Sequence, residues 1–252
     1  MQTDIQKAFT QASKQLFLLD YDGTLREFEK DPLAATPTEE IKALLRGLGS
    51  TPGIQVVLIS GRNHDLMETW FGGLPVSMVA EHGFFVKMKD AEWTPAMDMD
   101  ESWKPVVREV FERYGAQVPL STTEEKHSAI AWHYRASDAT VADPMAEQAL
   151  QVLTVLAKAL PITIVPGHQV LEVHIKGIDK GVAAKQFLDT ATGSDNKPYD
   201  FILAAGDDTT DEDLFKAMPE GAFTVKVGDG DTDAKLHVSN PAGLRILLKQ
   251  LA

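Results

Sequence analysis

Short apolar runs that end in polar loops recur along the chain and predict the strands of a sheet. Residues 16–19, 54–59, 201–205 and 223–227 each have the length of a buried strand. Stretches with helical periodicity follow three of these strands, at residues 65–70, 212–218 and 242–251, and another lies at residues 182–188. The alternation favours an α/β fold, with a mostly parallel sheet covered by helices on both faces.

The middle of the chain has a different pattern. Residues 129–134 alternate like a half-exposed strand, and residues 144–160 have a helical period that places Val155 on the buried side. Residues 162–165 and 170–174 flank a turn and predict a hairpin. Strands of this kind around one helix are typical of an α+β unit on an antiparallel sheet.

The length and composition indicate more than one compact unit. At 252 residues the chain exceeds the usual domain size. We expect a core made of residues 1–95 and 178–252, with a smaller α+β domain inserted at residues 96–177. Cysteine is absent, so disulfides and thiolate metal sites are excluded. Without a signal-peptide pattern or an apolar run of membrane-spanning length, we predict a soluble, cytoplasmic protein.

The charge balance limits the class of ligand. The net charge of −13 argues against nucleic acid, because phosphate backbones are bound mainly by clustered Lys and Arg. A small anionic substrate would need local compensation from a metal ion, helix N-termini and a few placed cations.

Two carboxylates follow the first predicted strand. Asp20 and Asp22 are two positions apart, and Gly23 allows a sharp turn directly after them. Both side chains can enter one cleft at the carboxyl edge of the sheet, where open α/β folds bind ligands. Such a pair needs either a cation or a retained proton. The alternative is an ordinary polar turn.

A second acidic cluster follows the strand at residues 201–205. Asp207 and Asp208 lie at its end, and three more acidic residues follow at positions 211–213, starting with Asp211. A helix start with acidic residues in the first turn accounts for the later acids, but not for Asp207 and Asp208. Hard oxygen ligands suit Mg²⁺, and Asp20 and Asp207 on neighbouring strands could supply two of them.

Two other segments could hold a phosphate. Ser60 and Gly61 end the strand at residues 54–59, where a hydroxyl and loop N–H groups can form a phosphate nest. An N-cap is the alternative for Ser60. Lys180 precedes a helical stretch and could supply a point charge, although lysine is also common on surfaces.

These segments together resemble the haloacid dehalogenase-like hydrolases. Asp20-x-Asp22-Gly23-Thr24, Ser60, Lys180 and Gly206-Asp207-Asp208 with Asp211 match the four motifs of that superfamily in order. The resemblance implies a Rossmann-like three-layer core with an inserted C2-type α/β cap. Within the superfamily, the chain resembles the trehalose-6-phosphate phosphatases. That closer resemblance rests on the segments at residues 59–62, 80–83, 126–128, 132–135, 170–173 and 206–212.

The resemblance implies a role for each motif residue. Asp20 would be the nucleophile and Asp22 the general acid and base. Gly23, Ser60, Gly61 and Lys180 would bind the phosphoryl group. Mg²⁺ would be held by Asp20, Asp207 and the backbone carbonyl of Asp22, with Asp208 and Asp211 behind these ligands.

The resemblance also implies which residues bind the sugar and which protein is a candidate partner. The residues implied for substrate binding are Arg62, Glu124, Lys126, Arg135, His168 and Glu172. Many relatives would have lysine at position 168. A synthase that makes the sugar phosphate is a candidate partner. The alternatives are a phosphatase of sucrose phosphate or mannosyl-3-phosphoglycerate, a phospho-accepting receiver module and an inactive domain that assists a synthase.

Overall fold

The chain forms two compact units. The computed structural model describes residues 2–29, 31–98, 100–167, 169–189 and 197–252. The larger unit contains Met1–Ala96 and Asp179–Ala252, and the smaller unit contains Met97–Ile178. Within the described ranges, no helix combines the length and the hydrophobicity needed to cross a bilayer.

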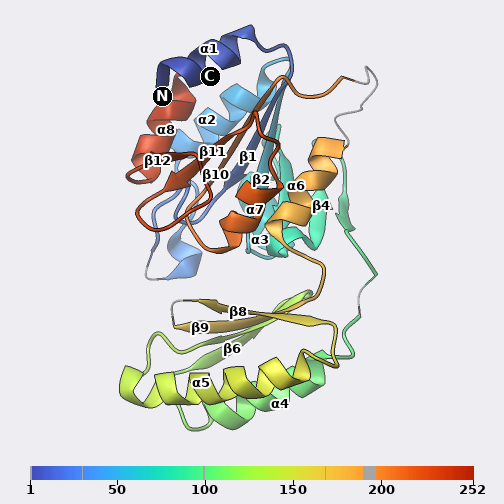
Figure 1. Ribbon diagram of the computed structural model, residues 1–252, viewed down its shortest axis with the longest axis vertical. Coiled ribbons are helices and arrows are strands. Elements are labelled where there is room, and N and C mark those ends of the chain that lie inside the picture. Colours follow the sequence, from blue (N-terminus) through green and yellow to red (C-terminus); the bar gives the residue numbers. More distant parts are fainter. Residues whose placement is uncertain (1, 30, 99, 168, 190–196) are drawn as a thin grey trace. The chain divides into compact units, whose positions relative to one another are not determined.

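An eight-stranded sheet forms the centre of the larger unit (Figure 1). Its strands are β1 (Gln15–Asp20), β2 (Ile54–Ile59), β3 (Ser77–Ala80), β4 (Phe85–Lys87), β5 (Trp93–Pro95), β10 (Phe201–Gly206), β11 (Phe223–Val227) and β12 (Leu236–Val238). Their order is β12-β11-β10-β1-β2-β3-β4-β5. In this order, each strand from β12 to β3 runs parallel to the next. The pairs β3–β4 and β4–β5 are antiparallel. The predicted α/β fold with a mostly parallel sheet is confirmed.

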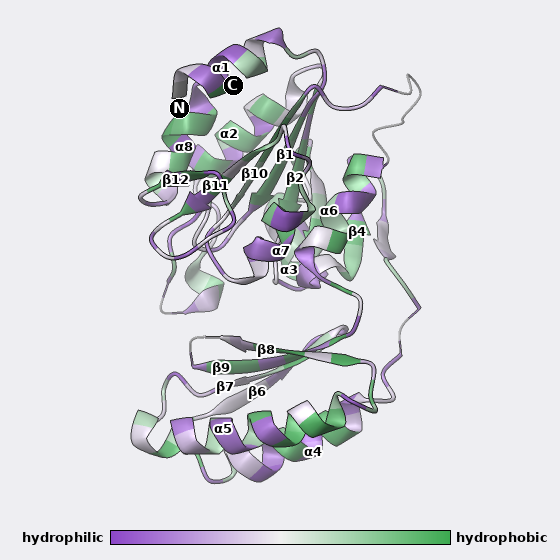
Figure 2. Ribbon diagram, in the orientation of Figure 1, coloured by the Kyte–Doolittle hydropathy of each residue, from purple (hydrophilic) through white to green (hydrophobic). Residues whose placement is uncertain are grey.

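Helices cover both faces of this sheet, which explains why β1 is buried along its whole length. The helices are α1 (Gln2–Gln11), α2 (Glu39–Ser50), α3 (His64–Phe71), α6 (Lys180–Asp189), α7 (Thr210–Ala217) and α8 (Pro241–Lys249). On one face, Leu16 and Leu18 belong to a cluster with Phe187 of α6 and Phe215 of α7. On the other face, the Phe17 ring lies 6.1 Å from the Phe9 ring of α1. Figure 2 shows hydrophobic central strands between helices that carry both hydrophobic and hydrophilic residues.

The smaller unit is an antiparallel sheet with two helices. The strands are β6 (Thr122–Glu125), β7 (Ala129–His133), β8 (Ile162–Gly167) and β9 (Val170–Ile175), in the order β6-β7-β9-β8. The helices α4 (Lys104–Gly115) and α5 (Ala139–Leu156) pack against each other and against this sheet. The Trp132 ring of β7 lies 6.0 Å from the Phe111 ring of α4, so the Trp132 side of β7 faces the helices.

Two expectations for the smaller unit were wrong in detail. The helix expected at residues 144–160 is α5, which begins at Ala139 because the Asp138 side chain caps it by accepting from the Thr140 N–H. Its buried stripe is made by alanines and Leu153, so Val155 is exposed. The strand expected to be half-exposed is buried over most of its length, because β7 is central in the sheet and carries small alanines between its larger residues.

Candidate active site

Four segments that carry the predicted motifs meet at the carboxyl edge of the large sheet. Asp20 is the last residue of β1, and it pairs in register with Ile59, which immediately precedes Ser60. On the other side of β1, the parallel strand β10 ends at Gly206, directly before Asp207. Lys180, expected just before a helix, is the first residue of α6. Because these strands are parallel neighbours, their polar ends share one edge of the sheet.

A buried lysine joins two of the aspartates. Lys180 Nζ donates to Asp20 Oδ1 at 2.7 Å and to Asp211 Oδ1 at 2.8 Å, and all three side chains are buried. Burial raises the pKa of Asp20 well above its usual value, with Asp211 and Asp207 adding to the effect and Lys180 opposing it. Burial alone would lower the pKa of Lys180, but Asp20 and Asp211 outweigh it and raise that pKa. Lys180 is therefore a fixed cation beside Asp20.

Asp20, Asp207 and Asp211 form a compact carboxylate cluster. Each offers an oxygen atom, and these three atoms lie within 4.8 Å of one another. Burial, followed by the charge of Asp211, raises the pKa of Asp207 to about 6. Three carboxylates this close require a shared proton or a bound cation. A divalent cation therefore fits the cluster, since carboxylate oxygens are the ligands that hard cations take.

The surrounding hydrogen bonds distinguish the three carboxylates. Besides Lys180, Asp211 accepts at Oδ2 from the backbone N–H groups of Asp207 and Asp208, both at 3.0 Å. These bonds occupy both oxygens of Asp211 and hold the loop between β10 and α7. Asp20 and Asp207 remain the better candidates for direct contact with a cation. The Asp208 side chain accepts from the Thr209 N–H and so belongs to the start of α7.

Gly23 is required by two features of this cluster. Its φ of +78° lies in the left-handed region, where L side chains are rare. A Cβ atom built at Gly23 would lie 2.1 Å from Asp207 Oδ2. Thr24, the next residue, donates from Oγ1 to Asp207 Oδ1 at 2.9 Å. The turn after β1 therefore shapes the position of Asp207, and Thr24 is a contributor that the sequence motif contained but to which no role was assigned.

Gly206 leaves the space that the Asp211 side chain fills. A Cβ atom at Gly206 would lie 2.1 Å from Asp211 Cγ. We expect Gly206→Ala to displace Asp211, to lower the free energy of unfolding by about 1 to 3 kcal/mol, and to reduce turnover. Urea unfolding and steady-state kinetics would measure both.

Gly221→Ala is the matched control for that change, because nothing lies within 4 Å of a Cβ atom at Gly221. We expect it to change the free energy of unfolding by no more than about 0.5 kcal/mol. Equal effects of the two substitutions would contradict the steric explanation.

The loop after β2 is held by the turn after β3. Ser60 is buried and its Oγ accepts from the Arg62 N–H at 3.2 Å, while the N-cap of α3 is Asn63. The N-cap alternative for Ser60 is therefore wrong. The His82 N–H donates to Ser60 O and the Glu81 N–H to Arg62 O. Glu81 and His82 adopt positive φ angles of 49° and 57°, a strained conformation that these hydrogen bonds compensate.

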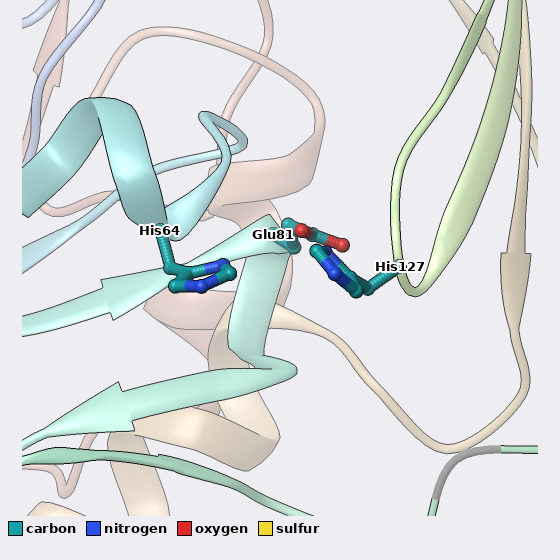
Figure 3. A group of neighbouring side chains, drawn as sticks. All are labelled: His64, Glu81 and His127. Atoms are coloured by element: carbon teal, nitrogen blue, oxygen red, sulfur yellow. The ribbon is translucent and has the colours of Figure 1, made fainter.

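Aromatic side chains lie next to the loop after β2 and the turn after β3. Figure 3 shows His64 at the start of α3 and Glu81 in the turn after β3, both in the larger unit. The His64 ring packs 4.3 Å from the Phe85 ring of β4. His127, also drawn there, belongs to the turn between β6 and β7 in the smaller unit. The neighbours of His64 are thus partly aromatic, and it contributes to packing between α3 and β4.

Arg62 binds one of the predicted catalytic acids. Its Nε and Nη2 donate to the two oxygens of Asp22 at 2.8 and 2.6 Å. Nη1 donates to the carbonyl oxygen of Pro32 at 2.7 Å. The expectation for Arg62 was contact with a substrate, and its contacts in the structure are with the protein.

Lys226 is a charged residue at this edge that the sequence motifs did not indicate. It lies in β11, paired in register with Gly206, and is buried. Its Nζ donates to the Asp207 carbonyl oxygen at 2.6 Å and lies 3.7 Å from Glu212 Oε1. The signal in the sequence was a lysine inside a mostly apolar strand. Lys226 brings a positive charge to the loop that carries Asp207.

Three of the predicted sugar-binding residues, Glu124, Lys126 and Glu172, lie on one face of the smaller unit's sheet. Glu124 and Glu172 both pair in register with Ala131, so they lie on either side of it. Because Trp132 faces the helices, this row lies on the opposite face of the sheet. Lys126 Nζ donates to Glu172 Oε1 at 2.8 Å.

Glu124 also has a partner on β7, and Arg135 is not part of this row. Glu124 lies 3.2 Å from His133 Nε2, and the hydrogen bond from His133 lowers the pKa of Glu124. Arg135 follows β7 and is exposed. His168 lies outside the described residues.

The family model described as trehalose-phosphatase matches residues 18–241, which include all four motif segments. The chain belongs to the trehalose-phosphatase family. It is 40% identical over 247 residues to a bifunctional trehalose-6-phosphate synthase/phosphatase of Thermoproteus tenax, covering 98% of this chain and 33% of that protein. The chain spans about a third of the length of the curated relatives it matches.

Solved structures show the same fold. The C-terminal domain of the Candida albicans trehalose-6-phosphate phosphatase superposes with a TM-score of 0.90 at 31% identity, covering 99% of this chain and 96% of that one. A haloacid dehalogenase-like hydrolase from Bacteroides thetaiotaomicron has a TM-score of 0.64 at 16% identity, with 95% and 100% covered, which shows likeness of fold alone. The predicted haloacid dehalogenase-like fold of this trehalose-phosphatase family member is confirmed.

Proposed function

We propose that this chain is a magnesium-dependent phosphatase that hydrolyses trehalose 6-phosphate to trehalose and phosphate. The observation that carries the proposal is the group of buried Asp20, Lys180 and Asp211 with half-buried Asp207, in a chain whose family match spans residues 18–241. The names of the T. tenax and C. albicans relatives supply the substrate.

Asp20 attacks phosphorus in line and forms an aspartyl-phosphate, while the bond from phosphorus to the sugar oxygen breaks. Asp22 gives its proton to that oxygen as trehalose leaves. Asp22 then takes a proton from the water that attacks the aspartyl-phosphate, which releases phosphate and restores both carboxyl groups. Lys180 is already paired with Asp20, which places its charge beside the phosphoryl oxygens. Ser60, Gly61 and the turn at Gly23 complete the proposed phosphate site.

The residues that would hold Mg²⁺ are the carboxylates of Asp20 and Asp207 and the backbone carbonyl of Asp22, supported by Asp208 and Asp211. When bound, the ion supplies positive charge that draws the anionic nucleophile and the anionic phosphate together. The same charge favours ionised Asp20, whose pKa burial raises in the metal-free protein.

The pKa of Asp207 leads to a prediction for metal binding. Because that pKa is raised to about 6, the folded metal-free protein holds a proton on Asp207 at lower pH, and the proton competes with the metal. We expect Mg²⁺ to raise the melting temperature more at one pH unit above this value than at one unit below it. Differential scanning fluorimetry with and without EDTA measures the shift.

Asp207→Asn is the informative comparison for this experiment. It should abolish the shift at both pH values, because the amide is a weaker ligand and does not titrate in this range. A shift that is independent of pH in the unsubstituted protein would contradict the assignment of Asp207 as a ligand.

We propose that the smaller unit recognises the sugar. Glu124, Lys126 and Glu172 on the helix-free face of its sheet can accept from and donate to glucose hydroxyls. Arg135 and His168 are proposed to complete this set.

Glu172→Gln should raise KM for trehalose 6-phosphate by about ten-fold, because a charged acceptor is lost. Turnover of p-nitrophenyl phosphate, which has no sugar, should be unchanged. Glu147→Gln, at an exposed position of α5, is the control and should change neither value. Equal losses with both substrates in Glu172→Gln would contradict a role in sugar recognition.

A substrate panel tests the proposed function. Phosphate release should be fastest from trehalose 6-phosphate and should require Mg²⁺, with EDTA abolishing it. Sucrose phosphate and mannosyl-3-phosphoglycerate are the informative competitors, and faster release from either would assign the chain to that substrate instead. Stable labelling by acetyl phosphate without release from any sugar phosphate would favour a receiver-like role.

The T. tenax relative carries synthase and phosphatase in its name, which motivates a partner proposal. We propose that a trehalose-6-phosphate synthase, as a neighbouring domain or a separate chain, supplies the substrate to this domain. A cytoplasmic location, where sugar nucleotides are available, belongs to the same proposal.

A further inference from the structure

Each of the three nitrogens of the Arg62 guanidinium donates a hydrogen bond to the protein. Nε and Nη2 form a bidentate pair with the Asp22 carboxylate, and Nη1 donates to Pro32 O. Bidentate pairing fixes the plane of a carboxylate as well as its position, which a single hydrogen bond does not.

Arg62 is itself held in place. Its Cζ lies 5.0 Å from the centre of the Trp70 ring in α3, and its side chain is only 13% exposed. The segment that supplies Pro32 is tied back to the end of β1 by Tyr21, whose hydroxyl donates to Ala35 O at 2.6 Å. Asp22 is 23% exposed, so the rigid support lies on one side and solvent reaches the other.

We propose that Arg62 is a positioning residue, which holds the carboxylate of Asp22 for proton transfer instead of binding the sugar. The proposal rests on the proposed function, in which Asp22 exchanges a proton with the sugar oxygen and then with water. A proton donor displaced by about 1 Å can cost on the order of 100-fold in rate, so support of this kind affects turnover more than binding.

The kinetic test compares kcat with KM in purified variants. Arg62→Gln should lower kcat for trehalose 6-phosphate by roughly 10- to 100-fold, with KM within about two-fold of the unsubstituted value. Arg62→Lys should recover only part of kcat, because an ammonium group keeps the charge but cannot form the bidentate pair. Arg46→Gln, at an exposed position of α2, is the control and should leave both constants unchanged. A rise in KM with kcat unchanged would overturn the proposal in favour of sugar contact.

A double-mutant cycle tests whether Arg62 acts through Asp22. In an Asp22→Asn background, Arg62→Gln should cause no further loss, because the carboxylate that it positions is already gone. Full additivity would overturn the proposal. If Asp22→Asn is too slow to measure, Trp70→Leu gives the second readout. It removes the ring under the guanidinium and should lower kcat without raising KM, whereas unchanged kcat would count against the positioning role.

Controls separate this inference from the proposed function. All variants are also assayed with p-nitrophenyl phosphate, so that the cycle can be read even if trehalose 6-phosphate is not the substrate. Failure of the unsubstituted protein on trehalose 6-phosphate alone would overturn the proposed substrate and leave the Arg62 test intact. Melting temperatures identify variants that lose activity by unfolding, and Arg62→Lys, which keeps the charge, decides the test if Arg62→Gln unfolds.

Discussion

Asp20→Asn should lower turnover by more than about 10⁴-fold, because the amide cannot form the acyl-phosphate intermediate. The fold should survive, since the amide is nearly isosteric and Lys180 keeps its bond to Asp211. Phosphate release measures the activity, and circular dichroism and the melting temperature measure the fold.

Asp90→Asn is the matched control for that substitution. Asp90 is exposed at a position with a φ of 63°, a conformation that asparagine tolerates as well as aspartate does. It should retain full turnover. Substantial turnover by Asp20→Asn would refute the nucleophile assignment and with it the proposed mechanism.

Lys180→Met should have the second-largest effect, on both stability and turnover. Removing the cation leaves Asp20 and Asp211 buried without the ammonium group that neutralises them. We expect the free energy of unfolding to fall by about 3 to 5 kcal/mol, as for other buried pairs that lose one partner. Turnover should fall by about 100- to 1000-fold, because a preorganised charge beside the phosphoryl group is lost.

Lys185→Met separates this effect from any general effect of losing a lysine on α6. Lys185 lies on the same helix and is exposed. It should change neither stability nor turnover measurably. The destabilisation by Lys180→Met should also be smaller at low pH, because burial raises the pKa of Asp20 and its protonated carboxyl group needs no cationic partner. A loss of stability that is independent of pH would indicate a packing defect instead.

Lys226 and Arg62 extend the site beyond the four motifs. One holds the backbone of the loop that carries Asp207, and the other holds the side chain of Asp22. Each acts on a predicted metal or catalytic residue from a neighbouring element. The proposed catalytic and metal-binding residues are thus supported by two cations of low exposure, in a protein whose net charge is −13.

The sequence alone was sufficient for the strands that end at the site, β1, β2 and β10, and for the order of the polar loops at their ends. A run such as residues 16–19 is apolar at every position because β1 is covered on both faces, and that signal is local. Parallel strands place their carboxyl ends at one edge, so the approach of Asp20 to Asp207 followed from the α/β pattern. The helix at Ala139 was placed five residues late because a capping aspartate is a weaker signal than a proline.

Only the tertiary structure decided which partner each charged group takes. Arg62 and Asp22 are 40 residues apart, and their bidentate pair depends on how the loops after β1 and β2 pack against Trp70. Asp211 was expected behind the metal ligands, and the structure shows which groups it binds: its oxygens accept from Lys180 and from two backbone N–H groups. Secondary structure is encoded by neighbouring residues, whereas these contacts depend on side-chain directions in elements that meet only after folding.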